Sequence, residues 1–482
     1  MRAGALGEPI HAQADGLGAD FLLNWSYFGF IGFHMNTKLC SLASAVSLAS
    51  RRWLGPLLVL AALPVGAPAS APPPASTPAA AGASVLAGLP VDLRPLRSLS
   101  PADEDFSDLA PLAKELDGVR VLALGEQTHG GREEFLLKLR LLRFLHEKLG
   151  YEVLLLESGF YDIGRLAQAM AAGQSLDALA PGNVFFMYAK TAEGRLLLQY
   201  LDRRQRSSRP LQLAGFDSQH SGELSLKGLL PGLRERIQQR APELARDHLW
   251  QPFAQLAQAL LSLRPPLPEA AEQAGFFQQV QAQRQALCRE IPPEQRAGVG
   301  SEGWWCQLLG SIESQARSLW SEGRDFQRDI QMGRHAIWLM EQQFPGKKAV
   351  VWAHTVHVAR GFERSPAHPQ SGEVMARHWG PAYKVLQFSA SGGQVLDYLR
   401  AVPQSVPAPV PGSLEALLGR SHPGAVASPA QLLIARGPVT LPQHNFEYQS
   451  GGIEASRGPG RLGQNWDFLI HIPRMSPVQM VR

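Results

Sequence analysis

The sequence of 482 residues predicts an α/β fold, with a three-layer parallel-sheet core, a helical insertion and a small C-terminal mixed segment. Three observations predict it. Short, almost continuously apolar runs recur along the chain, which is typical of parallel strands covered on both faces. Segments with helical spacing separate these runs, as in βαβ units. Between residues 224 and 343 the chain is instead rich in Leu, Ala, Gln, Arg and Glu, which favours helices.

The first 84 residues are not expected to belong to this core. Arg51 and Arg52 precede an apolar run from Trp53 to Val65, and small residues with an A-x-A pattern follow. This order is typical of a secretory signal peptide, and the run is shorter than an ordinary transmembrane helix. We therefore expect a signal peptide region over residues 1–69, with Met35 as an alternative start, and a periplasmic or secreted protein. An uncleaved N-terminal anchor is the alternative.

A linker and two core segments complete the predicted domain organisation. Residues 70–84 are rich in Pro, Ala and Ser, which predicts a flexible linker. The first part of the α/β core is expected over 85–223 and the helical insertion over 224–343. The second part of the core and the C-terminal segment are expected over 344–482.

Five apolar runs are the predicted strands of the core. They are residues 119–125, 152–157, 211–217, 348–354 and 383–389. A helical pattern between Glu133 and Lys148 separates the first two runs, so these three elements are expected to form a βαβ unit. Prolines in RPPLPE and REIPPE divide the insertion into several amphipathic helices. A short strand is expected in DFLIHI, near the C-terminus.

Composition excludes one class of partner and leaves the cysteines open. The net charge is only +4, and no block of Lys and Arg occurs, so a nucleic-acid partner is not expected. Cys40 lies in the predicted signal region. Cys288 and Cys306 either form a disulfide or stay separate thiols, and no CxxC or Cys/His zinc pattern is present.

Ionisable side chains follow the ends of the first four predicted strands. The carboxyl ends of parallel strands meet at one edge of a sheet, where the functional crevice of such folds lies. Three carboxylates and three histidines would therefore face one cleft. They are Glu126, His129, Glu157, Asp217, His354 and His357.

This set of side chains favours hydrolysis by activated water. Histidine is the usual general base because its pKa lies near neutrality, and a carboxylate can orient its ring. No G-x-S-x-G motif occurs and no cysteine ends a strand, so a covalent serine or cysteine nucleophile is not expected. With two carboxylates near His129, we expect its pKa to be raised to roughly 7 or higher, against the opposing effect of burial.

At these residues the sequence resembles the erythromycin esterase family. The resemblance rests on GEQTHGGREEF at 125–135, the strand ending at Glu157, GFD at 215–217, RDIQM at 328–332 and WAHTVHV at 352–358. It implies hydrolysis of a macrolide lactone or a related small-molecule ester by water, with no required metal or cofactor. His129 matches the catalytic base of the family, and Glu126, Glu157 and His354 match supporting catalytic positions.

Further positions match the family less closely. Lys138 stands where the resistance enzymes commonly have Arg, Glu133 stands at the family's Glu after the histidine, and Thr355 replaces an Asn. With Asp217 and His357, Lys138 and Glu133 are predicted to bind substrate or support the site. For Lys138 the alternative is an ordinary surface pair with Glu134, four residues before it.

Two other classes of function remain compatible with the sequence. The same Glu, His and Asp side chains could bind a metal ion in a metal-dependent hydrolase, although no recognised ligand motif is present. The cleft could also belong to a non-enzymatic small-molecule-binding protein, since a fold does not imply a function.

Overall fold

The structure, a computed structural model, describes residues 86, 88–263, 265–420, 428–441, 446–449 and 457–481. The predicted signal peptide region, the linker at 70–84 and Cys40 lie outside these residues. In the described part of the chain, no helix is long and apolar enough to cross a membrane.

One eight-stranded sheet forms the core, in the order β1-β11-β14-β8-β2-β5-β3-β4. All neighbouring pairs from β14 to β4 are parallel, whereas β1 pairs with β11 and β11 with β14 in the antiparallel sense. All five predicted core strands and the short C-terminal strand are present. The strands are β1 (Val91–Leu96), β2 (Val121–Glu126), β3 (Tyr151–Gly159), β4 (Gln212–Asp217), β5 (Lys348–His354), β8 (Tyr383–Ala390), β11 (Ala430–Ala435) and β14 (Phe468–Ile472).

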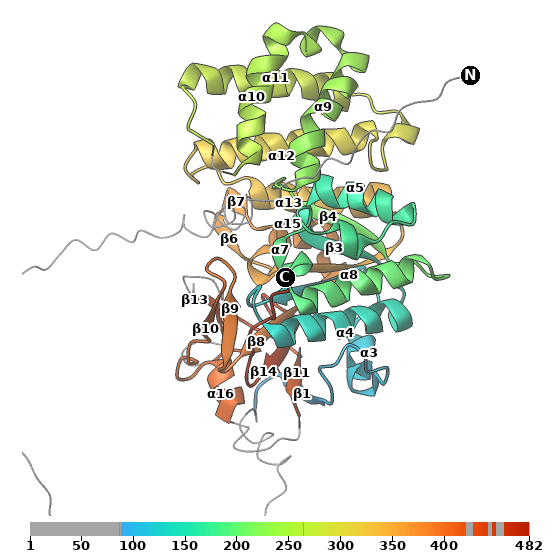
Figure 1. Ribbon diagram of the computed structural model, residues 1–482. Coiled ribbons are helices and arrows are strands. Elements are labelled where there is room, and N and C mark those ends of the chain that lie inside the picture. The colour runs from blue at the N-terminus through green and yellow to red at the C-terminus, as the bar shows by residue number, and fades with distance from the viewer. Residues whose placement is uncertain are drawn as a thin grey trace, which may run out of the picture.

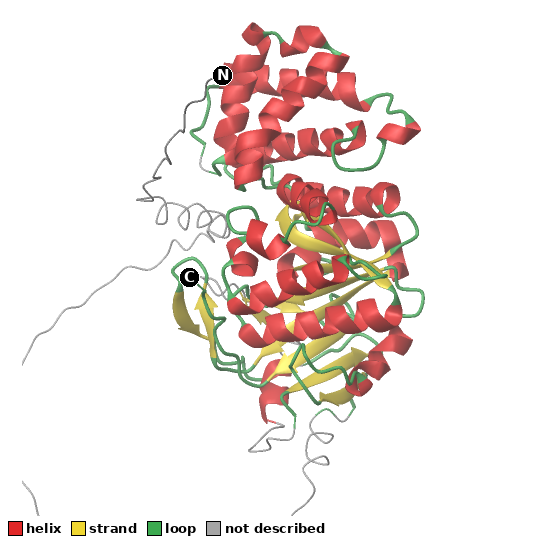
Figure 2. Ribbon diagram, turned by 45° about the vertical axis from the view of Figure 1, so that its right-hand side comes forward, coloured by secondary structure: helices red, strands yellow, loops and turns green. Residues whose placement is uncertain are grey.

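Helices cover both faces of the sheet, which confirms the predicted fold class (Figures 1 and 2). Successive residues of β2 alternate between the two layers. Val121 and Ala123 belong to the apolar cluster of α13 and α15, and Leu122 and Leu124 to that of α3, α4 and α8. These helices are α3 (Ala110–Glu115), α4 (Arg132–Leu149), α8 (Ala192–Gln205), α13 (Arg328–Trp338) and α15 (Ser371–Trp379), while α5 (Phe160–Ala171) contacts the edge strand β4.

Four long helices form a separate layer beyond α5 and α13, at the top of Figure 1. They are α9 (Glu223–Arg240), α10 (Asp247–Leu261), α11 (Ala270–Cys288) and α12 (Glu302–Trp320). The following helix, α13, contacts β4 and therefore packs against the core sheet. A disulfide joins Cys288 at the end of α11 to Cys306 in α12, with Cα atoms 5.6 Å apart, so these two cysteines are paired.

Short elements connect these layers. The helical turns are η1 (Ser107–Leu109), α6 (Leu176–Leu179), α7 (Phe186–Ala189), η2 (Pro242–Ala245), η3 (Pro293–Gln295), the π-helical η4 (Leu339–Gln343), α14 (Thr355–Val358), η5 (Gly380–Ala382) and α16 (Leu414–Arg420). Two-stranded ribbons are formed by β6 (Glu363–Ser365) with β7 (His368–Pro369), β9 (Gln394–Asp397) with β10 (Val402–Ser405), and β12 (Phe446–Gln449) with β13 (Arg457–Gly460).

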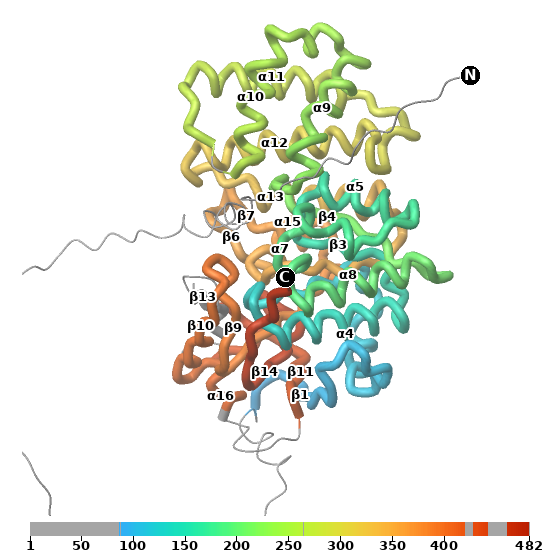
Figure 3. Tube along the Cα trace, in the orientation of Figure 1, coloured from blue at the N-terminus to red at the C-terminus, as the bar shows by residue number. Residues whose placement is uncertain are grey.

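The C-terminal residues return to the loop that follows β2. In Figure 3 this red segment runs from β14 towards α7. Val478 N donates to Gly130 O at 3.0 Å, and Arg132 N donates to Ser476 O at 2.9 Å. The end of the chain is thereby hydrogen-bonded to both sides of the Gly130–Gly131 turn, next to His129.

Candidate active site

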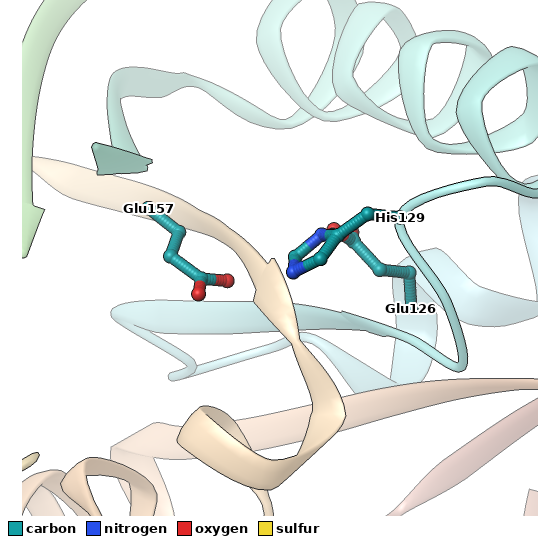
Figure 4. A group of neighbouring side chains, drawn as sticks. All are labelled: Glu126, His129 and Glu157. Carbon is teal, nitrogen blue, oxygen red and sulfur yellow. The ribbon is translucent and has the colours of Figure 1, made fainter. Parts of the chain in front are cut away.

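Three neighbouring strands of the parallel sheet bring the predicted residues together. In the order β2-β5-β3, Glu126 ends β2 opposite His354 of β5, and Glu157 lies near the end of β3. His129 lies three residues beyond β2. Figure 4 shows Glu126 and Glu157 on opposite sides of the His129 ring. We call Glu126, His129 and Glu157 the central cluster.

The loop from Gln127 to Gly131 fixes the position of His129. Gln127 N and Thr128 N both donate to the carboxyl group of Glu134, at 3.0 and 3.4 Å. A Cβ atom at Gly130 would lie 1.9 Å from the backbone oxygen of Leu396, so no side chain fits there. Burial raises the pKa of Glu134 to about 8, against the opposing effect of the two N–H donors. The glycine and the buried carboxyl group therefore hold this tight turn after β2.

Glu126 is hydrogen-bonded to one side of the His129 ring, and Glu157 faces the other side without direct contact. His129 Nδ1 lies 2.9 Å from Glu126 Oε1, and the other ring nitrogen points towards Glu157 (Figure 4). Ligand atoms of the three side chains lie within 4.8 Å of one another. When Nδ1–H donates to Glu126, Nε2 carries the free lone pair, and it faces the space next to Glu157.

Burial, and not the neighbouring carboxylates, dominates the protonation of His129. Only 8% of His129 is exposed, and the rings of Phe185 and Tyr398 lie 4.8 and 5.2 Å from its ring. Burial lowers the pKa of His129 to about 4, although the charge of Glu157 opposes this. The expectation of a raised pKa was therefore wrong, because the aromatic enclosure outweighs the attraction of the carboxylates.

Lys138 belongs to the site and not to the protein surface. Its side chain is fully buried, and Nζ contacts Glu126 Oε2, lies 3.3 Å from Ala353 O and lies 4.6 Å from the centre of the Trp352 ring. Burial lowers the pKa of Lys138 well below its usual value, while the charge of Glu157 opposes this. The alternative of a surface pair with Glu134 is wrong, since Glu134 is also buried and contacts the loop after β2.

His354 supports the loop after β2 with both ring nitrogens. Nε2 lies 3.0 Å from Gln127 O, and Nδ1 accepts a hydrogen bond from Val356 N at 3.3 Å. Burial, followed by the charges of His129 and His357, lowers the pKa of His354 well below its usual value. His354 is therefore a neutral ring with Nε2–H donating, and its backbone N donates to Glu157 Oε2 at 2.7 Å.

His357 lies between two carboxylates, and its pKa is shifted in the opposite direction. Nδ1 lies 2.5 Å from Asp329 Oδ1, and Nε2 lies 3.3 Å from Glu157 Oε1. Burial would lower the pKa of His357, but the charges of Asp329 and Glu157 outweigh it and raise the pKa. The two carboxylates therefore favour the imidazolium form of His357, whose Nε2 faces one oxygen of Glu157.

Asp217 binds the arginine that begins α13. Arg328 donates from Nε and from one terminal nitrogen to the two oxygens of Asp217, at 3.1 and 2.7 Å, and that terminal nitrogen lies 3.8 Å from Glu157 Oε1. Burial would raise the pKa of Asp217, but Arg328 keeps it lowered. Asp217 thus acts on the cluster through Arg328.

Glu133 lies outside the central cluster. Its Oε2 accepts a hydrogen bond from Ser476 N at 2.6 Å, so it fixes the C-terminal segment over the Gly130–Gly131 turn. Glu133 was predicted to support the site directly. In the structure it contacts the C-terminal segment, which in turn contacts the turn next to His129. No contact between Glu133 and the central cluster occurs among the residues that the structure describes.

Four residues of the site were not predicted as functional. Arg328 and Asp329 lie in the quoted RDIQM motif, and an Arg-Asp pair at the start of a helix was the signal that could have indicated them. Phe185 and Tyr398 carry no such signal, because they come from a loop before α7 and from the β9–β10 ribbon.

The central cluster could also supply ligands to a metal ion. Glu126, His129 and Glu157 each offer one ligand atom, which suits a small divalent cation. However, Lys138 Nζ contacts Glu126, and Arg328 and His357 contact Glu157, so three basic side chains surround the same oxygens. The donor set fits a metal ion by type, while the surrounding charge disfavours one.

The protein has an α/β fold with a histidine–carboxylate cluster where its parallel strands end. The family model described as erythromycin esterase matches residues 146–475, which is more than half of the chain, so the protein belongs to the erythromycin esterase family. Glu157, Asp217, His354 and His357 lie within the match, and Glu126, His129 and Lys138 precede it.

Three named relatives are similar in sequence. "Putative hydrolase YbfO" of Bacillus subtilis (strain 168) is 25% identical over 370 residues, covering 69% of this chain and 79% of that protein. Erythromycin esterase type II of Escherichia coli is 39% identical over 79 residues, or 16% of this chain and 19% of that protein. Erythromycin esterase type I of Escherichia coli is 28% identical over 167 residues, or 34% and 38% of the two chains.

Solved structures share the fold. A Bacillus cereus protein of 19% identity matches 85% of this chain and 100% of its own, with a TM-score of 0.62. A mutant of the erythromycin esterase EreC in its open conformation, also 19% identical, matches 80% and 98% of the two chains with a TM-score of 0.60.

Proposed function

We propose that this protein hydrolyses an ester or macrolactone with a water molecule activated by His129. The observation that carries the proposal is the orientation of His129 between Glu126 and Glu157. Nδ1 is fixed by Glu126 at 2.9 Å, and the second nitrogen faces Glu157 on the other side of the ring.

The first step is removal of a proton from water. With a pKa of about 4, His129 is neutral at neutral pH, so its Nε2 is free to accept that proton. The resulting imidazolium lies between Glu126 and Glu157, whose charges stabilise it as it forms. The two carboxylates thus assist His129 at the moment when it takes the proton, although its pKa is low.

The hydroxide then adds to the carbonyl carbon of the ester, and the carbonyl oxygen becomes an oxyanion. The protonated His357 and Arg328 both lie against Glu157 and supply positive charge on this side of the cluster. His354 is less suited to this role, because both of its ring nitrogens are engaged in the loop after β2.

Collapse of the intermediate releases the alcohol. The bond from the carbonyl carbon to the alkoxide oxygen breaks, and the His129 imidazolium returns its proton to that oxygen. The products are a carboxylic acid and an alcohol, so one water molecule is consumed. Tyr398 packs on the His129 ring, and burial raises its pKa to about 12, so its hydroxyl stays protonated and can donate to a substrate oxygen.

Family membership and the named relatives support hydrolase activity, and the two Escherichia coli proteins act as precedents for a macrolide lactone.

The test is a screen of esters and macrolactones, read by mass spectrometry for addition of one water. We expect His129→Ala to lower turnover by about 10³-fold. Glu133→Gln is the matched control, since Glu133 binds only the C-terminal segment, and it should keep nearly full activity. Turnover by His129→Ala within about tenfold of wild type would exclude this histidine as the base.

A metal-dependent hydrolase is the second candidate, because the three ligand atoms of the central cluster lie within 4.8 Å of one another. Elemental analysis of the purified protein distinguishes the two. Stoichiometric zinc or manganese, together with loss of activity to a chelator, would favour the metal mechanism over direct activation of water by His129.

Export is a separate proposal that rests on the apolar run from Trp53 to Val65. N-terminal sequencing of the protein from the periplasmic or culture fraction should give a mature chain that begins near Ser70. A full-length chain in the cytoplasmic fraction would contradict it.

A further inference from the structure

A groove of about 880 Å³ lies where the helical insertion meets the core. One wall consists of the end of α11, the connection after it and α12, and the other wall of α13, η4 and α15. The disulfide between Cys288 and Cys306 lies in the first wall. None of the residues that line the groove belongs to the central cluster, so this is a different site.

Four arginines converge on this groove from three segments of the chain. Arg284 comes from α11, Arg289 and Arg296 from the connection to α12, and Arg334 from α13. The lining holds one carboxylate, Glu341. The groove is therefore strongly cationic.

The single carboxylate of the groove, Glu341, already has basic and hydrogen-bonding partners. Glu341 Oε1 accepts hydrogen bonds from Arg120 and from Trp379 Nε1, both at 2.8 Å, and lies 3.2 Å from His378 Nε2. It leaves little negative charge for the four arginines. Two of its three partners, Arg120 and Trp379, lie outside the residues that line the groove.

The arginines themselves have few acidic partners. Arg284 lies 3.7 Å from Glu313, and Arg296 donates to the backbone oxygen of Ile291. Arg289 and Arg334 are exposed and form no ion pair within the described part of the chain. Several guanidinium groups around one hollow, with so few carboxylates, match an anionic group such as phosphate, which the planar guanidinium of arginine binds in a bidentate way.

The rest of the lining is neutral or apolar. Ile291, Ile337 and Trp338 contribute apolar surface, and Gln307 and Gln331 offer amides at the base of the groove. The volume is that of a site for a small organic molecule and exceeds that of a simple ion. A ligand that fits both features has an anionic group and an apolar or aromatic part.

We propose that this groove binds an organic phosphate. The phosphate group accepts hydrogen bonds from Arg289 and Arg334, and the organic part lies on Ile337 and Trp338. The proposal does not rest on the esterase mechanism, because no residue of the central cluster takes part.

Titration calorimetry of the full-length protein at low salt tests the proposal, with phenyl phosphate, inorganic phosphate and benzoate as probes. We expect one phenyl phosphate per chain, bound more tightly than inorganic phosphate, which lacks the ring, and more tightly than benzoate, which lacks the phosphate. The double variant Arg289→Ser/Arg334→Ser should weaken phenyl phosphate binding by about tenfold or more. Trp338→Leu should bring phenyl phosphate and inorganic phosphate to similar affinities.

The matched control is Arg94→Ser/Arg203→Ser, which removes two exposed arginines outside the groove. Its affinity for phenyl phosphate should equal that of wild type. Equal weakening in both double variants would show non-specific attraction and would overturn the proposal, as would the absence of binding to wild type. Binding of benzoate as tight as that of phenyl phosphate would overturn the assignment to phosphate. All variants change exposed or partly exposed side chains, and their melting temperatures check that they fold.

Discussion

The two sides of the site shift the pKa values of their histidines in opposite directions. On one side, His129 and His354 are enclosed by aromatic rings and backbone, and burial lowers the pKa of both. On the other side, His357 is held by Asp329 and Glu157, and the two charges raise its pKa in spite of similar burial. His357 is in direct contact with two carboxylates and His129 with one. The comparison indicates that two such contacts are needed to outweigh the effect of burial on the pKa of a histidine in this protein.

Glu157 connects the two sides. Its Oε2 accepts from the backbone N of His354, and its Oε1 faces His357 and Arg328. The neutral side thus supplies the base, and the charged side supplies a fixed positive field next to the same carboxylate. This separation permits acid and base roles at one pH.

Among the variants that test this comparison through activity, the largest effect is expected from breaking the charged side at Asp329. Asp329→Asn should lower kcat/KM at neutral pH by about 10²-fold, because His357 loses the partner that keeps it protonated. In wild type, the rate should fall as pH rises through the raised pKa of His357. In the variant this alkaline limb should move to lower pH. A pH–rate profile on one ester measures both, and an unmoved alkaline limb would show that the His357 charge plays no part in catalysis.

The next effect concerns the buried Lys138–Glu126 pair on the neutral side. Lys138→Met should destabilise the fold by about 3 kcal/mol, because it leaves a buried carboxyl group without its cationic partner. The double variant Lys138→Met/Glu126→Gln should recover part of this loss. Urea denaturation of the two single variants and the double variant gives the coupling. Additive losses would mean that the two side chains do not interact.

A smaller effect is expected at Tyr398, which covers His129. Tyr398→Phe keeps the ring that packs at 5.2 Å and removes only the hydroxyl. We expect kcat to fall by about tenfold with KM little changed, since one hydrogen bond to a substrate oxygen is lost in the transition state. Steady-state kinetics on the same ester measures it, with Phe185→Leu as a control for packing alone. An unchanged kcat would leave Tyr398 as a packing residue.

The sequence predicted the centre of the sheet and the centre of the site for the same reason. Buried parallel strands are read as continuous apolar runs, and the side chains that end them must meet at one edge of the sheet. Glu126, Glu157 and His354 were found in this way, and His129 by its place three residues after Glu126.

The parts that could not be predicted come from outside these runs. β1 contains Arg94 and Pro95 and lacks a strong apolar pattern, and it was missed together with the antiparallel β11. Tyr398 reaches the site from the β9–β10 ribbon, far from His129 in sequence, so nothing local indicated the aromatic enclosure that lowers the pKa of His129. The error in the expected pKa follows directly from that missing contact.

The central claim is that His129 acts as a neutral base in an enclosed site, and the acid limb of the pH–rate profile tests it most directly. Because the folded-state pKa of His129 is lowered to about 4, kcat/KM should rise with pH around a midpoint near 4 and stay high through pH 6. Because this pKa is lowered by folding, the unfolded chain binds more protons than the folded chain between about pH 4 and 6.5. The free energy of unfolding should therefore fall as pH drops through this range. Circular dichroism must confirm that the protein is folded at each pH. A midpoint at about 6.5 or above in folded protein would contradict the account, because His129 would then be governed by its carboxylate neighbours and not by burial.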